Sequence, residues 1–172
     1  MRLLFTMDAK DYGPDAKRFV RPSVRGIILK GSTIAMVHSL KYDYYKFPGG
    51  GIEEGESYPA ALCREVREEA GLQVKKDSIR EYGLVPRLEK GRRGEVFVQD
   101  NFYYFCRTEN LPVSQDLDDY EAEEQFTLSY VDPYFAIRVN RQRPHGPKNQ
   151  NMLEREARVL ELLLEEGYFK GE

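Results

Sequence analysis

One stretch, Gly50–Leu72, limits the possible folds of this chain more than any other, because it joins a glycine-rich turn directly to a helix with clear ends. Ser57 is a suitable N-cap, and Pro59 is tolerated in a first helical turn, where no N–H partner is needed. Gly71 stands where a left-handed residue would end the helix. The sequence therefore predicts a helix at Tyr58–Ala70, entered from a tight loop that other groups can approach closely.

The predicted helix carries three glutamates on one face, because Glu65, Glu68 and Glu69 are spaced at i, i+3 and i+4. Like charges on neighbouring turns repel, and a solvated glutamate-rich face is the ordinary alternative. However, hard divalent cations such as Mg²⁺ prefer clustered carboxylate and carbonyl oxygens, and the glycine loop can present a bare carbonyl to the same point. The combination favours a metal site.

A fixed pattern of residues runs through this stretch and matches the Nudix box, G-x5-E-x7-R-E-U-x-E-E-x-G-U with U aliphatic. Every specified position is filled, and Phe47-Pro48-Gly49 leads into the box as in that family. The chain thus resembles the Nudix hydrolases. The matching residues are Gly50, Glu56, Arg64, Glu65, Val66, Glu68, Glu69, Gly71 and Leu72.

The resemblance implies an enzyme that cleaves the pyrophosphate linkage of a nucleoside diphosphate joined to another group X. It also implies an α/β/α sandwich around a mixed β-sheet, with Arg64 and Glu56 holding the helix and the loop together. One of the helix glutamates, or a glutamate from a remote loop, would act as the base. The implied ligands of Mg²⁺ or Mn²⁺ are Glu65, Glu68, Glu69 and the Gly49 carbonyl.

An acidic run at residues 116–124 precedes a predicted strand, Phe126–Val131. Such a run is usually a solvated loop. The Nudix family, however, often takes a further metal-binding or basic glutamate from this loop, for which Glu121, Glu123 and Glu124 are the candidates. We choose Glu124, because it lies nearest the strand. The residues assigned to catalysis are thus Glu56, Arg64, Glu65, Glu68 and Glu124.

Candidate substrate contacts come from two predicted strands. Arg21 and Arg25 share a face of the first, where an arginine could bind a phosphate or stack on a base, although two exposed strand arginines are the ordinary alternative. The strand Val96–Cys106 is apolar on both faces, so helices should cover both. The polar residues Gln99 and Asn101 interrupt this apolar strand, and they would contact a base or ribose if their face opens to the cleft. We predict substrate contacts by Arg25, Gln99 and Asn101.

Elsewhere the pattern predicts a hairpin, a further strand, two basic connections and a final helix capped by Asn151. The first basic connection is either a solvated loop or a contact for substrate phosphates. These segments are Arg21–Leu29 with Thr33–His38 for the hairpin, Ile79–Leu88 for the strand, and Glu89–Gly94 and Arg138–Lys148 for the connections.

The whole chain, residues 1–172, is predicted to be one domain, since 41% of its residues are hydrophobic and no linker interrupts it. Without a signal peptide or an apolar span we expect a cytoplasmic protein that does not enter membranes, with Cys63 and Cys106 reduced. A net charge of −3 argues against binding of a nucleic-acid polymer.

The expected partner is a small nucleotide-derived substrate, and a homodimer is possible. Nucleoside triphosphates, oxidised nucleotides, dinucleotide polyphosphates, ADP-ribose and other sugar nucleotides all remain open as substrates. The alternative from another class is a catalytically silent nucleotide sensor, although such domains usually have a broken box or an added DNA-binding domain. An isomerase or a decapping enzyme on the same fold would need additional catalytic residues or a basic RNA channel.

Overall fold

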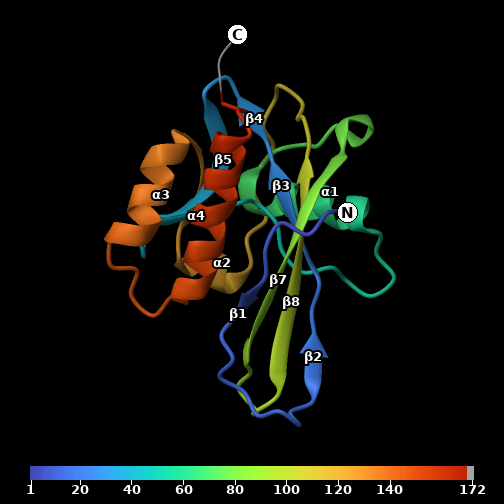
Figure 1. Ribbon diagram of the computed structural model, residues 1–172. Coiled ribbons are helices and arrows are strands. Elements are labelled where there is room, and N and C mark those ends of the chain that lie inside the picture. Colours follow the sequence, from blue (N-terminus) through green and yellow to red (C-terminus); the bar gives the residue numbers. More distant parts are fainter. Residues whose placement is uncertain (170–172) are drawn as a thin grey trace.

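The computed structural model describes residues 1–169, so the end of the predicted domain, residues 170–172, lies outside the described residues. Strands form a central layer with helices on both sides (Figure 1). The expected α/β/α architecture is therefore confirmed. Within the described residues the α-helices are α1 (Tyr58–Ala70), α2 (Asp119–Glu123), α3 (Pro133–Gln142) and α4 (Gln150–Glu165), and a 3-10 turn covers Lys76–Ser78.

The strands pair into two sheets rather than one. The five-stranded sheet is mixed: β7 and β8 are antiparallel, β1 runs parallel to β7, and β2 and β3 run parallel to β8. The four-stranded sheet is antiparallel, with β5 pairing with β4, β6 and β9. The strands are β1 (Met7–Asp8), β2 (Arg18–Val20), β3 (Ser23–Ile27), β4 (Leu29–Lys30), β5 (Thr33–Ser39), β6 (Tyr44–Lys46), β7 (Arg80–Lys90), β8 (Val96–Phe105) and β9 (Phe126–Val131).

The predicted hairpin is only partly correct. Its first run is divided at Ile28, because residues 23–27 pair with β8 of one sheet while Leu29 and Lys30 pair with β5 of the other. One continuous apolar run therefore serves both sheets, which places the glycine loop beside β3 at their junction.

Helix α1 forms at the predicted residues. The Ser57 hydroxyl accepts a hydrogen bond from Ala60 N (3.3 Å), and Gly71 ends the helix in the left-handed conformation at φ 64°. Leu62 and Val66 are fully buried on the strand layer. The glutamates lie on a different side of the helix from Leu62 and Val66, and this side faces the glycine loop.

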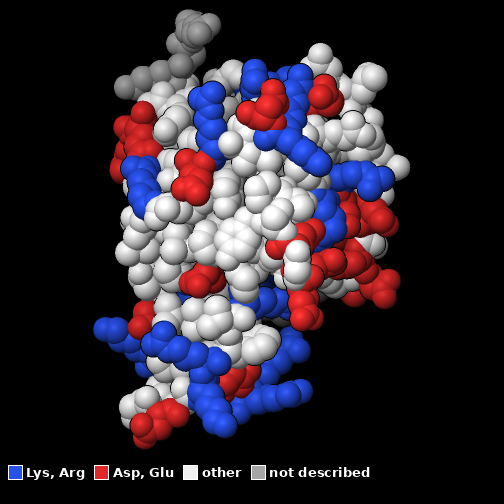
Figure 2. All heavy atoms as spheres, turned by 90° about the vertical axis from the view of Figure 1, so that its right-hand side faces the viewer, with Lys and Arg blue, Asp and Glu red and all other residues white. Residues whose placement is uncertain are grey.

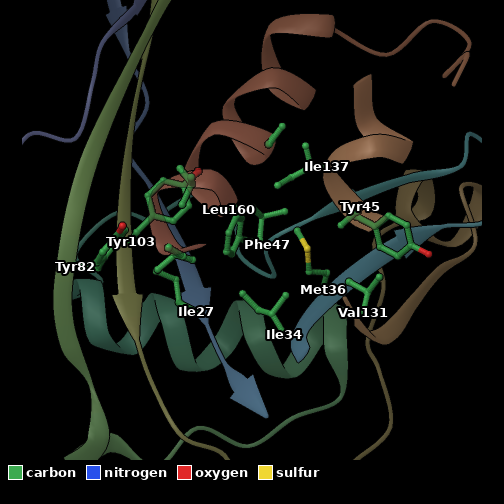
Figure 3. Close-up of a cluster of buried hydrophobic side chains, with 14 of the residues drawn as sticks. Ile27, Ile34, Met36, Tyr45, Phe47, Tyr82, Tyr103, Val131, Ile137 and Leu160 are labelled. Carbon is green, nitrogen blue, oxygen red and sulfur yellow. The ribbon is translucent and has the colours of Figure 1, made fainter. Parts of the chain in front are cut away.

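Helices α3 and α4 cover the opposite face, where the larger core lies (Figure 3). Leu160 of α4 lies in this cluster with Ile27 of β3 and with Phe47, which follows β6. The rings of Phe47 and Tyr103 meet edge to face, with centroids 5.3 Å apart. Because Phe47 precedes the glycine loop and has no exposed surface, the loop starts from a fixed point.

Three boundary predictions at the C-terminal side are wrong. Asn149, not Asn151, caps α4, because its side chain accepts from Asn151 N (2.8 Å) and Met152 N (3.3 Å). Part of the predicted basic connection is helical, since Asp132 caps α3 and that helix continues to Gln142. The acidic run contains α2, which a capping box between Asp118 and Glu121 begins.

A side chain of α3 covers the outer edge of β6. Asn140 accepts a hydrogen bond from Tyr45 N and donates one to Tyr45 O, both at 2.8 Å. The amide therefore pairs with β6 as a neighbouring strand would. His145 in turn contacts the Asn140 carbonyl oxygen at 3.0 Å.

The β7–β8 hairpin extends well beyond the helices, with β2 alongside it (Figure 1). Its tip lies in the predicted basic connection, of which Glu89 and Lys90 still belong to β7 and residues 92–93 form a turn. Among the described residues no helix is long and apolar enough to cross a membrane.

Candidate active site

The glycine loop is held against β3 by backbone hydrogen bonds from Val24 N to Gly50 O (3.0 Å) and from Gly26 N to Pro48 O (2.8 Å). Of its three glycines, only Gly49 has a positive φ, 148°, and a Cβ there would lie 2.0 Å from Val24 O. Gly50 is needed for a different reason, because its Cβ would lie 2.6 Å from a carboxylate oxygen of Glu65. The loop thus approaches both the sheet and helix α1.

Arg64 joins helix α1 to this loop. Its Nε and Nη2 donate to the two carboxylate oxygens of Glu56, each at 2.9 Å, and Nη2 also donates to Gly51 O (3.0 Å). This bidentate pair lowers the pKa of Glu56 and raises that of Arg64. The structure therefore brings the two residues together in the arrangement that the Nudix resemblance implies.

Arg64 also bridges two of the three helix glutamates. Its Nη1 donates to Glu65 (2.8 Å) and to Glu68 (3.1 Å). Burial raises the pKa of Glu65, and the hydrogen bond from Arg64 opposes that shift. Glu68 keeps 30% of its side-chain surface exposed. The positive charge of Arg64 thus reduces the repulsion that was expected between these glutamates.

Glu69 is the most buried of the three, at 1% exposure, and it pairs with Lys46. Gly49 N also donates to its carboxylate at 2.9 Å. Burial raises the pKa of Glu69 to about 7, while Lys46 and the Gly49 amide act in the opposite direction. Lys46 was not among the predicted site residues, although it lies only a few residues before the glycine loop.

Arg25 is buried rather than exposed on its strand, so the ordinary alternative of a solvated arginine is wrong for it. Its Nη1 donates to Gly49 O (2.8 Å), and Lys46 Nζ lies 3.4 Å from the same oxygen. The carbonyl predicted as a metal ligand therefore has two cationic neighbours. A second arginine, Arg21, lies against Gly51, whose Cβ would be 3.2 Å from the guanidinium.

Asn101 lies beneath the site and not on its surface. It is fully buried, and its side-chain oxygen accepts from Arg25 (3.4 Å) and from Arg155 of α4 (3.0 Å). Gln99 accepts from Arg155 (2.9 Å) and donates to Ser23 Oγ (3.2 Å). In this arrangement Asn101 supports Arg25, whereas Gln99 reaches the cavity.

Arg155 itself is a site residue that the sequence analysis missed. It is fully buried, and its Nη2 donates to Glu156 (2.7 Å), which is also fully buried. The available signal was Glu156, which lies three residues after Leu153 and four before Leu160 and so falls on the apolar stripe of α4. A charge at such a position needs a buried partner.

These residues surround a cavity of about 390 Å³ between the glycine loop, α1, α2, β8 and α4. Carboxylates, cations, amides and aromatic rings all face it, and Arg25 and Lys46 lie against the glycine loop. Its lining includes Ser23, Arg25, Lys46, Gly49, Glu65, Glu69, Phe97, Gln99, Tyr120, Glu121, Phe126, Lys148 and Arg155.

The acidic loop contributes Glu121 to this cavity, whereas Glu124, the residue chosen from the sequence, is directed elsewhere. Glu121 accepts from Asp118 N (2.9 Å) and from the Tyr120 hydroxyl (3.0 Å), which fixes its carboxylate beside the helix glutamates. Glu124 accepts from the Tyr44 hydroxyl (2.6 Å) and pairs with Lys148. The capping box therefore decides which glutamate faces the site.

The donor set suits a hard cation, because every candidate ligand is a carboxylate or carbonyl oxygen. A neighbouring cavity of about 270 Å³ is lined by Glu53, Glu65, Glu68, Asp116, Asp118 and Glu121, with Arg21 and Arg64 among them. Within residues 1–169 no three acidic, histidine or cysteine side chains are already gathered closely enough to hold an ion. Arg64 is bonded to Glu65 and Glu68, and Lys46 to Glu69, so a cation would compete with these two side chains for the carboxylates.

The family model of the NUDIX domain matches residues 20–145, which is most of the chain. The chain belongs to the Nudix family. As a complete-box member it is a Nudix hydrolase. A search of curated proteins found no match.

A solved structure of the family shares the fold. A NUDIX hydrolase from Nitrosomonas europaea aligns with a TM-score of 0.57 at 16% identity, over 82% of this chain and 90% of that one. The solution structure of the E. coli ORF135 protein aligns with a TM-score of 0.49 at 20% identity, over 87% and 96% of the two chains.

Proposed function

We propose that this Nudix hydrolase cleaves the pyrophosphate linkage of a nucleoside diphosphate joined to a group X, with Mg²⁺ or Mn²⁺ bound at the glycine loop. The observation that carries the proposal is one cavity whose lining combines the carboxylates of Glu65, Glu69 and Glu121 with cationic side chains such as Arg25. A pyrophosphate bound to cations fits this lining, because its charge must be neutralised before a water can attack.

Use of a divalent cation is general in Nudix hydrolases. Here Glu65, Glu68, Glu69, Glu121 and the Gly49 carbonyl would hold it. When bound, the cation supplies charge neutralisation of the phosphate oxygens and acidification of bound water. Glu121 replaces Glu124 as the loop glutamate in this proposal, because only Glu121 lines the cavity.

The remaining groups have separate tasks. Arg25 binds a phosphate oxygen through the part of its guanidinium that is not bonded to Gly49 O or Asn101. A carboxylate among the helix glutamates and Glu121 takes the proton from the attacking water, and the bond from phosphorus to the bridging oxygen breaks. Arg64 binds no substrate in this scheme and keeps α1 and the loop in register through Glu56.

A substrate screen tests the proposal. Phosphate or nucleotide release should be measured with nucleoside triphosphates, oxidised nucleotides, dinucleotide polyphosphates and sugar nucleotides, each with Mg²⁺, with Mn²⁺ and with excess EDTA. We expect turnover of at least one substrate with metal and none with EDTA. Turnover in EDTA, with absence of metal verified, would refute the metal-dependent mechanism. Tight nucleotide binding without turnover of any substrate would favour the sensor alternative.

Glutamine variants of the carboxylates assign the roles. A metal ligand should lose both rate and the thermal stabilisation given by added metal, since binding to the native state alone raises stability. The base should lose rate but keep that stabilisation. The variants are Glu65→Gln, Glu68→Gln, Glu69→Gln and Glu121→Gln, with Glu123→Gln as a control on an exposed carboxylate. A cytoplasmic location and a homodimer stay predictions from the sequence.

A further inference from the structure

A second cavity, of about 660 Å³, lies under the tip of the β7–β8 hairpin. It shares two lining residues, Arg21 and Phe97, with the cavity of the active site, so the two are neighbours along one surface. We define the hairpin cleft by its lining, which is Phe19, Arg21, Glu89, Lys90, Gly91, Arg92, Arg93, Glu95 and Phe97.

The cations of the hairpin cleft have no acidic partner. Within residues 1–169 no ion pair is formed by Arg21, Lys90, Arg92 or Arg93. The cleft's two glutamates are bonded otherwise: Glu89 lies 3.1 Å from Arg87 and accepts from Asn149 (3.1 Å), and Glu95 accepts from the Arg93 backbone N (2.9 Å). The cleft therefore presents an excess of positive charge suited to an anion.

An aromatic wall lies beside these cations. The rings of Phe19 and Phe97 are 6.1 Å apart at the centroids and inclined by 31°. Phe19 leaves 54% of its surface exposed, and the next residue, Val20, leaves 53%. Successive side chains of a strand point to opposite faces, and of these two residues Phe19 lines the cleft. An exposed aromatic ring on an edge strand is suited to contact a flat apolar ring.

Acidic and basic side chains gather in different parts of this face. Figure 2 shows acidic atoms gathered at mid-height on the right-hand side of the view and basic atoms gathered toward its lower end, where the hairpin projects in Figure 1. Arg21 lines the acidic cavity, the active-site cavity and the hairpin cleft, and so stands at their junction. A bound molecule that reaches from the carboxylates to the hairpin must pass Arg21.

We propose that the hairpin cleft binds the far half of an elongated substrate, in which the group X is itself a phosphorylated nucleoside. This proposal rests on the proposed pyrophosphatase function and names its substrate class, the dinucleoside polyphosphates. The first nucleotide occupies the active-site cavity, the connecting phosphates lie along Arg21, and the second base stacks on Phe19 beside Arg92 and Arg93. A sugar in place of the second base would leave the aromatic wall uncovered.

Steady-state kinetics on two kinds of substrate test this inference. The variants are Phe19→Ser and the double change Arg92→Ser with Arg93→Ser, assayed with diadenosine tetraphosphate and with the single-nucleoside compounds ATP and ADP-ribose. Stacking of one base contributes about 1–3 kcal/mol, so Phe19→Ser should raise KM for diadenosine tetraphosphate roughly tenfold. KM for the single-nucleoside compounds should stay within about twofold.

Matched controls separate the cleft from general surface effects. Leu111→Ser removes an exposed apolar side chain, 80% accessible, and Arg138→Ser removes an exposed arginine, both outside the cleft. Neither should change any KM. Equal effects of Phe19→Ser on all substrates, or no effect on diadenosine tetraphosphate, would overturn the inference while leaving the pyrophosphatase function intact.

Two further outcomes are decisive. If ATP or ADP-ribose is hydrolysed but diadenosine tetraphosphate is not, the substrate class is wrong and the proposed function stands. If no pyrophosphate is cleaved with either metal, the proposed function itself fails. A 5′-triphosphate RNA whose KM falls with each added nucleotide would show that the hairpin cleft follows a polymer, which would also overturn the inference.

Discussion

Replacing Gly50 by alanine should lower activity roughly 10²-fold while leaving the fold intact. An alanine Cβ at this position would lie 2.6 and 2.8 Å from the two carboxylate oxygens of Glu65 and 2.7 Å from its carboxyl carbon. Contacts between nonbonded heavy atoms are favourable near about 3.5 Å, so the carboxylate must move by about 1 Å. A displacement of about 1 Å at a catalytic group can lower the rate roughly 10²-fold.

The stability of this variant should change little. The clash involves only the end of a flexible side chain, and Gly50 does not have a positive φ. Loss of glycine also reduces the entropy of the unfolded chain, which stabilises by about 0.4–1 kcal/mol and offsets a weakened Glu65–Arg64 contact. We expect a net change within about 1 kcal/mol.

Gly49→Ala is the matched contrast. Its φ of 148° is strained for alanine, and the Cβ would lie 2.0 Å from the backbone oxygen of Val24, which cannot rotate away. Strain of about 1–3 kcal/mol and overpacking of about 1–3 kcal/mol together predict a loss of about 2–6 kcal/mol in the free energy of unfolding. That is a large part of the roughly 5–15 kcal/mol typical of a domain.

Urea unfolding of the metal-free protein and kcat/KM with saturating Mg²⁺ measure the two effects separately. We expect opposite results: Gly50→Ala should be stable with a roughly 10²-fold lower rate, and Gly49→Ala should be unstable. A Gly50→Ala enzyme with the wild-type rate would show that the position of the Glu65 carboxylate does not matter. A Gly49→Ala protein of unchanged stability would show that the loop can move away from β3.

Further predictions concern the carboxylates and the substrate contacts. Glu121→Gln should lower kcat roughly 10²-fold or more, which is the scale of catalytic groups. Glu124→Gln should instead lower the free energy of unfolding by about 1–3 kcal/mol, because Glu124 contacts Tyr44 and Lys148. Kinetics and urea unfolding of both variants measure these effects, and the reverse pattern would restore Glu124 to the site. Arg25→Ala and Asn101→Ala should raise KM more than they lower kcat, since Asn101 acts by holding Arg25; an unchanged KM in both would contradict phosphate binding there. At limiting Mg²⁺, activity should rise from pH 6 to pH 8, because Glu69 must lose its proton with a pKa of about 7 before it can bind a cation; a flat profile would refute this. Folding raises the pKa of Glu69 from 4.5 to about 7, so its contribution to the stability of the metal-free protein is present at low pH and is lost as pH rises through about 7. Between pH 4.5 and about 7 the free energy of unfolding should therefore decline less in Glu69→Gln than in the wild type.

The parts of the fold that the sequence predicted well are those set by local signals. Helix α1 was found at its true ends because Ser57 and Gly71 form its caps within the same short segment. The contact between Arg64 and Glu56 followed from the family motif. Local reasoning could not show that the strands divide into two sheets, because the division at Ile28 depends on pairing with β8, far along the chain.

The site was predicted less completely, for reasons that are equally specific. Glu121 and Glu124 are three residues apart in one acidic run, and charge alone does not distinguish them. The signal that could have done so is the spacing Asp118-x-x-Glu121, a capping box that fixes the orientation of Glu121. Lys46 and Arg155 were missed because their roles depend on burial against Glu69 and Asn101, which only the folded chain brings together.

Asn140 decides how this molecule can associate. Its amide occupies both the N–H and the carbonyl of Tyr45, so the outer edge of β6 has no free backbone groups at that residue to offer another chain. Strand addition at that edge, whether in a dimer or in an aggregate, would first have to displace α3. The protein thus protects a short sheet edge with one side chain of a helix, and pairing of copies through strands would have to use another edge, such as that of β9.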